Sequence, residues 1–152
     1  MLLTEDRQRP NEHWTRQLPQ MLRPLGVHAE VVSTGARAYE LVKTRLFHAA
    51  VIDLDTPAGL PEDDANPALT TGDSGGGGLW LLEVLSRLPD HPPIVVVNPH
   101  AYSQRQVARL LQQALKLGAF SVVNRPVQPE GLLRTIADIV NRRYHGQWPT
   151  PE

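Results

Sequence analysis

Short apolar runs alternate with longer segments of helical periodicity along the chain. Five runs of four residues are predominantly apolar, at 1–4, 29–32, 49–52, 94–97 and 120–123. Three of these runs are almost continuous in apolar character, which is typical of strands that are covered on both faces of a sheet. Between the runs, apolar residues recur at helical spacing within 14–25, 38–46, 81–88, 107–114 and 132–140.

Glycine and proline refine the limits of these helices. Gly26 and Gly118 each follow a helical stretch, and we expect both to cap its C-terminal end. Pro19 falls inside the first helical pattern, where an interior proline costs about 3 kcal/mol. We therefore expect a kink or a late start in that helix.

Five β/α repeats within roughly 140 residues predict one α/β domain over 1–143. The expected architecture is a doubly wound, five-stranded parallel sheet in the flavodoxin-like order 2-1-3-4-5, with helices on both faces. The polar segment 58–78 is rich in glycine and proline, and we expect a flexible insertion between the third strand and the third helix. Residues 144–152 are expected to form a C-terminal tail.

Composition excludes several functional classes. The 152 residues include 15 basic and 16 acidic side chains, a net charge of -1, which gives no electrostatic reason to bind nucleic acid or a membrane surface. The chain has no cysteine, so thiol nucleophiles, disulfides and cysteine-ligated metals are excluded. Neither a signal peptide nor a membrane span is expected, and we predict a cytoplasmic location.

Four carboxylates are predicted to meet at one edge of the sheet. Glu5 and Asp6 follow the first strand, and Asp53 and Asp55 follow the third. In the expected order these strands are neighbours, and ligands bind beyond the carboxyl ends of strands at this position. Two carboxylates 4 Å apart repel by about 4 kcal/mol at an effective dielectric of 20, so the cluster needs a raised pKa or a cation. Ligands that are all oxygen favour Mg²⁺, whereas the simpler interpretation is a set of solvated loop residues or helix N-caps.

The sequence at this point resembles the receiver domains of two-component response regulators, over residues 1–143. Four segments carry the resemblance: Glu5-Asp6 after the first strand, 51–57 around the third, 118–119 before the fifth and 125–127 after it. In particular, Asp53 lies four residues before Pro57, as the phospho-acceptor of the family does.

The resemblance implies a role for each matching residue. Asp53 would be the nucleophile that takes a phosphoryl group from a histidine kinase, a phosphotransfer protein or a small phosphodonor. Asp6 and Asp53 would bind Mg²⁺ directly, Glu5 through water, and Asp55 through its backbone carbonyl. Activity would be limited to this self-phosphorylation and to autodephosphorylation. An unidentified output protein would read the signal on the face of the fourth helix, fifth strand and fifth helix, and homodimerisation is a further expectation from the family.

Three departures from the family pattern leave two functions open. Asn98 stands where receivers carry Ser or Thr, Arg125 replaces the usual lysine, and Val122 replaces the aromatic switch residue. Arginine keeps the charge of lysine but is not an equivalent donor. One interpretation is a competent acceptor in which Asn98 and Arg125 assist Asp53, and the alternative is a degenerate receiver that acts as a phosphorylation-independent interaction module.

Other motifs fit poorly. The segment 72–76 reads like the nucleophile motif of trypsin-like proteases, but that family is an all-β double barrel. The glycine run 75–78 lacks the ending of a P-loop and is expected to be linker, with a lid over Asp53 as a further hypothesis. An FMN-binding flavodoxin is excluded because the acidic residues in 5–9 would repel the FMN phosphate. The six histidines show no metal-ligand spacing, although His100 is expected near the crevice.

Overall fold

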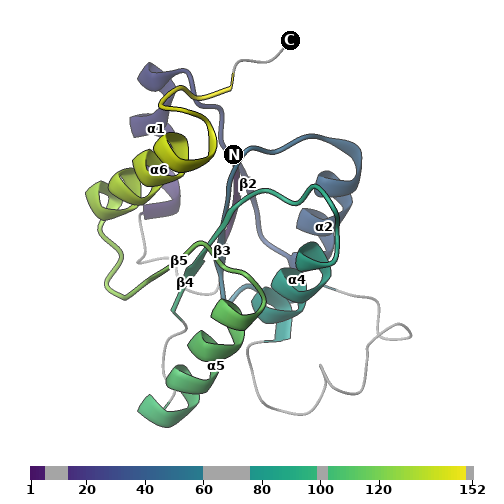
Figure 1. Ribbon diagram of the computed structural model, residues 1–152. Coiled ribbons are helices and arrows are strands. Elements are labelled where there is room, and N and C mark those ends of the chain that lie inside the picture. Colours follow the sequence, from purple (N-terminus) through teal and green to yellow (C-terminus); the bar gives the residue numbers. More distant parts are fainter. Residues whose placement is uncertain (6–13, 60–75, 99–102, 150–152) are drawn as a thin grey trace.

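The computed structural model describes residues 1–5, 14–59, 76–98 and 103–149 (Figure 1). Its strands are β1 (Leu2–Thr4), β2 (Glu30–Val32), β3 (Ala50–Asp53), β4 (Ile94–Val97) and β5 (Ser121–Val123). Its helices are α1 (Trp14–Leu22), the short 3₁₀ helix η1 (Arg23–Leu25), α2 (Gly35–Thr44), α4 (Gly76–Ser86), α5 (Gln104–Lys116) and α6 (Pro129–Arg143).

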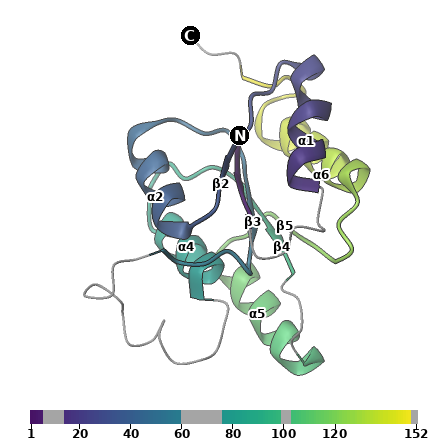
Figure 2. The same ribbon diagram turned by 180° about the vertical axis from the view of Figure 1, so that it is seen from behind.

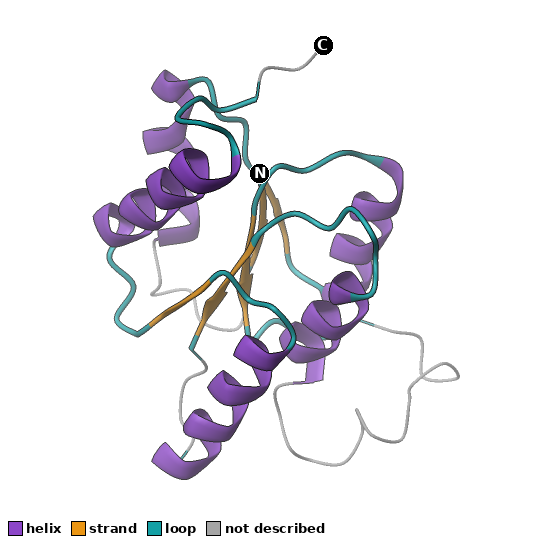
Figure 3. Cartoon of the chain, in the orientation of Figure 1, coloured by secondary structure: helices purple, strands orange, loops and turns teal. Residues whose placement is uncertain are grey.

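The five strands form one parallel sheet in the order β2-β1-β3-β4-β5, which confirms the predicted topology. Figure 3 shows the sheet as a central layer between helices. Helices α1 and α6 cover one face, and α2, α4 and α5 lie on the other (Figures 1 and 2). The strand order places β1 and β4 on either side of β3, so residues at the carboxyl end of β3 lie at the centre of the sheet edge.

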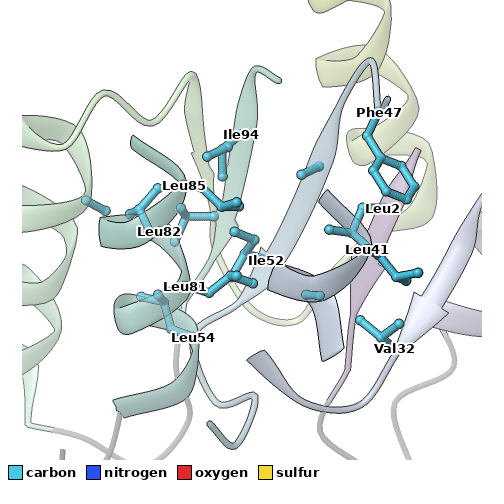
Figure 4. Packing of buried hydrophobic residues seen from close by; sticks show 14 residues of the cluster. Leu2, Val32, Leu41, Phe47, Ile52, Leu54, Leu81, Leu82, Leu85 and Ile94 are labelled. Carbon is cyan, nitrogen blue, oxygen red and sulfur yellow. The ribbon is translucent and has the colours of Figure 1, made fainter. Parts of the chain in front are cut away.

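Two hydrophobic clusters fill the space between the sheet and its helices, one on each face. Figure 4 shows the first cluster, in which Leu2 and Ile52 of the sheet pack with Leu81 and Leu85 of α4. The next residue along a strand belongs to the other cluster, as Leu3 does beside Leu2. Because side chains alternate between the faces of a strand, coverage on both faces accounts for the continuous apolar runs of the sequence.

The predicted glycine caps are confirmed. Gly26 has a φ of 78° and donates its N–H to the carbonyl of Arg23. Gly118 has a φ of 94° and donates to the carbonyl of Leu115. Both backbones lie in the left-handed region that glycine adopts without steric cost, so each glycine ends the preceding helix.

Of the two outcomes predicted for the first helix, the late start is wrong, because α1 includes Pro19 in its interior, and the kink stays a prediction. Trp14, Leu18 and Leu22 on this helix are all buried in the second cluster. Burial of a large apolar side chain contributes about 1.5–3 kcal/mol, so three such residues outweigh the cost of one interior proline.

The glycine run departs from the predicted flexible insertion. Gly76, Gly77 and Gly78 form the first turn of α4, while residues 60–75 lie outside the described part of the chain, as do the protease-like motif up to Gly75 and the proposed lid. A Cβ atom on Gly77 would lie 1.9 Å from the backbone oxygen of Thr56. The glycines therefore allow close packing of a helix against the loop that follows β3. From composition alone, this glycine run is predicted to be a linker.

The chain after α6 packs back onto the domain as far as it is described. Tyr144 and Trp148 are partly buried against the second cluster, and both rings make edge-on contacts with the ring of His48. The hydroxyl of Tyr144 also donates to the backbone carbonyl of His48. Within the described ranges, every helix is too short or too polar to cross a membrane.

Candidate functional site

Asp53 is the last residue of β3, and its side chain is only 2% exposed. Its backbone N–H donates to the hydroxyl of Thr4 on the neighbouring strand, over 2.9 Å. The hydroxyl of Thr56 donates to the same oxygen atom of Thr4, over 2.8 Å. The two threonines are fully buried and fix the turn of the backbone at Asp53.

Arg125 lies shortly after β5 and brings its guanidinium to the carboxylates that follow β3. Its Nη2 atom donates to Oδ1 of Asp53 over 2.6 Å and lies 3.5 Å from Oδ2 of Asp55. Its Nε atom donates to the backbone carbonyl of Asn98 over 2.6 Å. The Arg125 side chain is 10% exposed, so this ion pair is largely withdrawn from water. The rigid fork of the guanidinium thus joins three strand ends at one point.

Burial and the positive charge of Arg125 act in opposite directions on the pKa of Asp53. Burial raises the pKa of the Asp53 carboxyl, because removal from water disfavours the charged form. The hydrogen bond and the positive charge of Arg125, and the N–H of Asp55 that donates to Oδ1 over 2.9 Å, lower the pKa and offset part of this effect. The site therefore holds a buried carboxylate whose charge depends on a neighbouring cation.

Asn98 directly follows β4, and its side-chain amide is turned toward Asn124. The Nδ2 atom donates to Oδ1 of Asn124 over 2.5 Å. Within the described part of the chain, Oδ1 of Asn98 is buried without a hydrogen-bond partner. The structure thus connects Asn98 to Arg125 through its backbone carbonyl, while its side chain pairs with another residue.

The structure brings together Asp53, Asp55, Asn98 and Arg125, four of the residues that the sequence assigned to the site. Glu5 follows β1, and its Oε2 atom accepts a hydrogen bond of 3.4 Å from the hydroxyl of Thr15. Asp6 and His100 lie outside the described residues.

Thr4, Thr56 and Asn124 contribute to the site without having been singled out from the sequence. Thr4 carries the clearest signal, because it is a polar residue at the carboxyl end of an otherwise apolar strand. That end of a parallel strand is where ligand-binding residues gather.

The donor atoms suit a hard divalent cation such as Mg²⁺, because carboxylate and carbonyl oxygens are the ligands that it prefers. In the ranges that the structure describes, no three Asp, Glu, His or Cys residues are grouped closely enough to hold a metal. Asp6, a predicted direct ligand, is not among those residues. The positive charge next to Asp53 in the described site is therefore that of Arg125.

The chain matches no family model and no curated protein sequence. Its fold is similar to that of many solved structures. A response regulator receiver domain protein from Methanospirillum hungatei aligns with a TM-score of 0.68 at 19% identity, over 95% of this chain and 94% of that chain. A response regulator from Chloroflexus aurantiacus aligns with a TM-score of 0.64 at 18% identity, over 93% and 97% of the two chains.

A third similar structure is a response regulator from Burkholderia pseudomallei, described with a phosphorylated aspartic acid, a calcium ion and citrate. It aligns with a TM-score of 0.59 at 21% identity, over 95% of this chain and 71% of that chain. These likenesses agree with the five-stranded topology and with the resemblance found in the sequence. The chain therefore has the fold of response regulator receiver domains.

Proposed function

We propose that the protein is a two-component receiver that accepts a phosphoryl group on Asp53. The observation that carries this proposal is the buried carboxylate at the carboxyl end of the central strand β3, held 2.6 Å from the guanidinium of Arg125. Phosphoryl transfer depends mainly on positioning and on neutralisation of charge, and this arrangement provides both. The receiver fold, with a phosphorylated aspartic acid in one similar structure, supports the same assignment.

In the proposed reaction, an ionised carboxylate oxygen of Asp53 attacks the phosphorus atom of a phosphohistidine or of acetyl phosphate. The bond between phosphorus and the leaving nitrogen or oxygen breaks, and the leaving group keeps the electron pair. The product is an acyl phosphate on Asp53, which water hydrolyses to inorganic phosphate and the original carboxylate. Arg125 holds the attacking carboxylate in place and balances negative charge on the transferred group.

Mg²⁺ is the proposed cofactor, bound directly by the carboxylates of Asp6 and Asp53 and by the backbone carbonyl of Asp55, and through water by Glu5. When bound, the ion would supply charge neutralisation to the transferring group. Asn98 would contribute at the end of β4, where receivers usually present a hydroxyl.

The proposed partners are a histidine kinase or a phosphotransfer protein as donor and a separate output protein as recipient, in the cytoplasm. The output face would consist of α5, β5 and α6, and homodimerisation would use α5 and α6. Val122 on β5 is partly buried against the first hydrophobic cluster, where the usual receiver has an aromatic switch residue. The signal would therefore leave this face without rotation of an aromatic ring.

The experiment that tests the proposal is intact-protein mass spectrometry after incubation with acetyl phosphate and Mg²⁺. The wild-type protein should gain the mass of one phosphoryl group, and Asp53→Asn should not. Asp90→Asn is the matched control, because Asp90 is an exposed carboxylate in the described part of the chain and should not affect labelling. A wild-type protein that stays unlabelled beside a labelled receiver control would overturn the proposal.

A phosphorylation-independent interaction module is the second candidate function, and one feature of the site favours it. Arg125 already pairs with Asp53, and the side-chain amide of Asn98 pairs with Asn124. A site held by internal contacts of this kind can keep one conformation without a phosphoryl group. Binding of a partner with equal affinity to wild type and to Asp53→Asn would support this function in place of the first.

A further inference from the structure

The guanidinium of Arg125 lies beside the carboxylates of Asp53 and Asp55, in the position that a bound cation would take. It is 10% exposed, and it faces the carboxylates of Asp53 and Asp55, which are 2% and 8% exposed. Buried carboxylates need a counter-charge, since an uncompensated charge in a protein interior is strongly destabilising. In the described site, Arg125 supplies that counter-charge from within the chain.

A second contact holds the guanidinium in this orientation. The Nε atom of Arg125 donates to the carbonyl of Asn98 over 2.6 Å, while Nη2 donates to Asp53 over the same distance. Two donors of one rigid planar group are therefore engaged with two different strand ends. A lysine ammonium is a single point of charge on a flexible stem and cannot reproduce this planar fork. Replacement of lysine by arginine thus changes how firmly the cation is held.

We infer that Arg125 occupies part of the coordination space around Asp53 and so weakens the binding of divalent cations to that carboxylate. This inference deepens the proposed function and rests on it for the identity of the site. Oδ1 of Asp53 is the atom that Arg125 contacts at 2.6 Å, and a divalent cation at Asp53 would have to share this carboxylate with the guanidinium. A positive charge a few ångströms from a divalent cation also repels it directly.

Binding of a cation at Asp53 and formation of the Arg125–Asp53 ion pair therefore weaken each other. Removal of the guanidinium charge should strengthen binding of Mg²⁺ by about tenfold, which lies within the usual range of coupling between sites. Arg125→Lys keeps the charge but loses the fork, and its affinity should lie between those of wild type and of Arg125→Gln. In this chain, Arg125 would then lower the affinity of the site for divalent cations.

Isothermal titration of the full chain with Mg²⁺, without any phosphodonor, measures this coupling. Wild type, Arg125→Gln and Arg125→Lys are compared at matched ionic strength, since salt alone screens charges. Arg87→Gln is the matched control, because Arg87 is an exposed arginine that pairs with Glu83 on α4. The affinity of this variant for Mg²⁺ should equal that of wild type. Tighter binding by Arg125→Gln than by wild type and Arg87→Gln, with Arg125→Lys in between, supports the inference, and equal affinity in all four proteins overturns it.

Loss of Arg125 can also destabilise the fold, because it leaves two buried carboxylates without this partner. Thermal unfolding with and without Mg²⁺ covers that case. If the cation takes over the role of Arg125, Mg²⁺ should raise the melting temperature of Arg125→Gln more than that of wild type, and NaCl of equal ionic strength should not. If Arg125→Gln stays unfolded in Mg²⁺, the titration of Arg125→Lys decides: affinity equal to wild type overturns the inference, and tighter binding supports it.

Asp53→Asn provides the second half of the test. If the effect acts through Asp53, the gain in Mg²⁺ affinity from Arg125→Gln should shrink when Asp53 is also replaced by asparagine. An undiminished gain in the double variant would contradict the assignment to this ion pair. Because these titrations contain no phosphodonor, failure of the inference is distinct from failure of the proposed phosphorylation, which the intact-mass experiment reports separately.

Discussion

The hydroxyl oxygen of Thr4 lies 2.9 Å from the backbone nitrogen of Asp53 and accepts its hydrogen bond. The same oxygen accepts the hydroxyl hydrogen of Thr56 at 2.8 Å, and all three residues are buried. One side chain at the end of β1 therefore positions both the last residue of β3 and the loop that follows it. The candidate acceptor is thus supported by a neighbouring strand as well as by Arg125.

Thr4→Val tests this support, because valine keeps the shape of threonine but removes the oxygen. The N–H of Asp53 and the hydroxyl of Thr56 would then lose this acceptor in the interior. A buried donor without a partner costs about 1–3 kcal/mol, so we expect a loss of about 2 kcal/mol in the free energy of unfolding. Urea unfolding measures it, with Thr44→Val on the exposed surface of α2 as the control. Equal stability of the two variants would contradict the assigned role.

Gly78 gives a second prediction, because it allows α4 to lie against the backbone at the end of β3 and the start of the loop that follows it. A Cβ atom on Gly78 would lie 2.5 Å from Cα of Leu54 and 2.6 Å from the backbone oxygen of Asp53. Gly78→Ala should therefore destabilise the fold by about 1–3 kcal/mol, the usual cost of overpacking.

Gly131→Ala is the matched control for this substitution, since Gly131 also lies in the first turn of a helix, α6. Its added Cβ would meet only Cβ of Gln128, at 3.8 Å, an ordinary contact. Alanine is the better helix former by about 1 kcal/mol, so this variant should be more stable than wild type. A gain in stability from both substitutions would show that α4 does not approach the loop closely.

The burial of His48 leads us to expect that the stability of the fold depends on pH. Burial lowers the pKa of His48 from the ordinary value of 6.5, so the folded protein binds this proton less readily than the unfolded chain. The contribution of His48 is therefore absent well above pH 6.5, and it destabilises the fold as the pH falls below that value.

His48→Phe removes this titration and keeps an aromatic ring beside Tyr144 and Trp148. The difference between the free energies of unfolding at pH about 7.5 and about 5.5 should shrink in this variant. His28→Phe, at an exposed position, is the control and should keep the wild-type difference. A difference that is unchanged by His48→Phe would assign the pH dependence to other groups.

The sequence was sufficient for the sheet, because its signal is local and repeated. Each strand is a short apolar run, and the order of the elements leaves few topologies for five β/α units. The topology predicts Asp53 and Asp55 at the ligand-binding edge, since the carboxyl ends of parallel strands share one edge. The expectation that Arg125 lies there rests on the resemblance to receiver domains, and the structure places it beside both carboxylates.

The features that the sequence did not predict depend on close contacts between segments that are far apart in the chain. Glycine disfavours helix, so the pattern of 75–78 predicts a linker, whereas packing against the loop after β3 makes glycine necessary in the first turn of α4. Similarly, the sequence assigns Asn98 to the site without specifying which of its groups takes part, and the contact with Arg125 uses its backbone carbonyl. A sequence specifies neither which face of an amide meets a neighbour nor how a guanidinium divides its donors.

The residue that carries the phosphoryl group can be identified by a chemical reaction. Borohydride reduces an acyl phosphate to an alcohol, so a phosphorylated aspartate becomes homoserine, which peptide sequencing by mass spectrometry can place. After treatment of the wild-type protein with acetyl phosphate and Mg²⁺, we predict homoserine at position 53 and at no other acidic residue. Homoserine at Asp55 or at an exposed aspartate, or no reduced residue in a folded protein beside a labelled receiver control, would contradict the account.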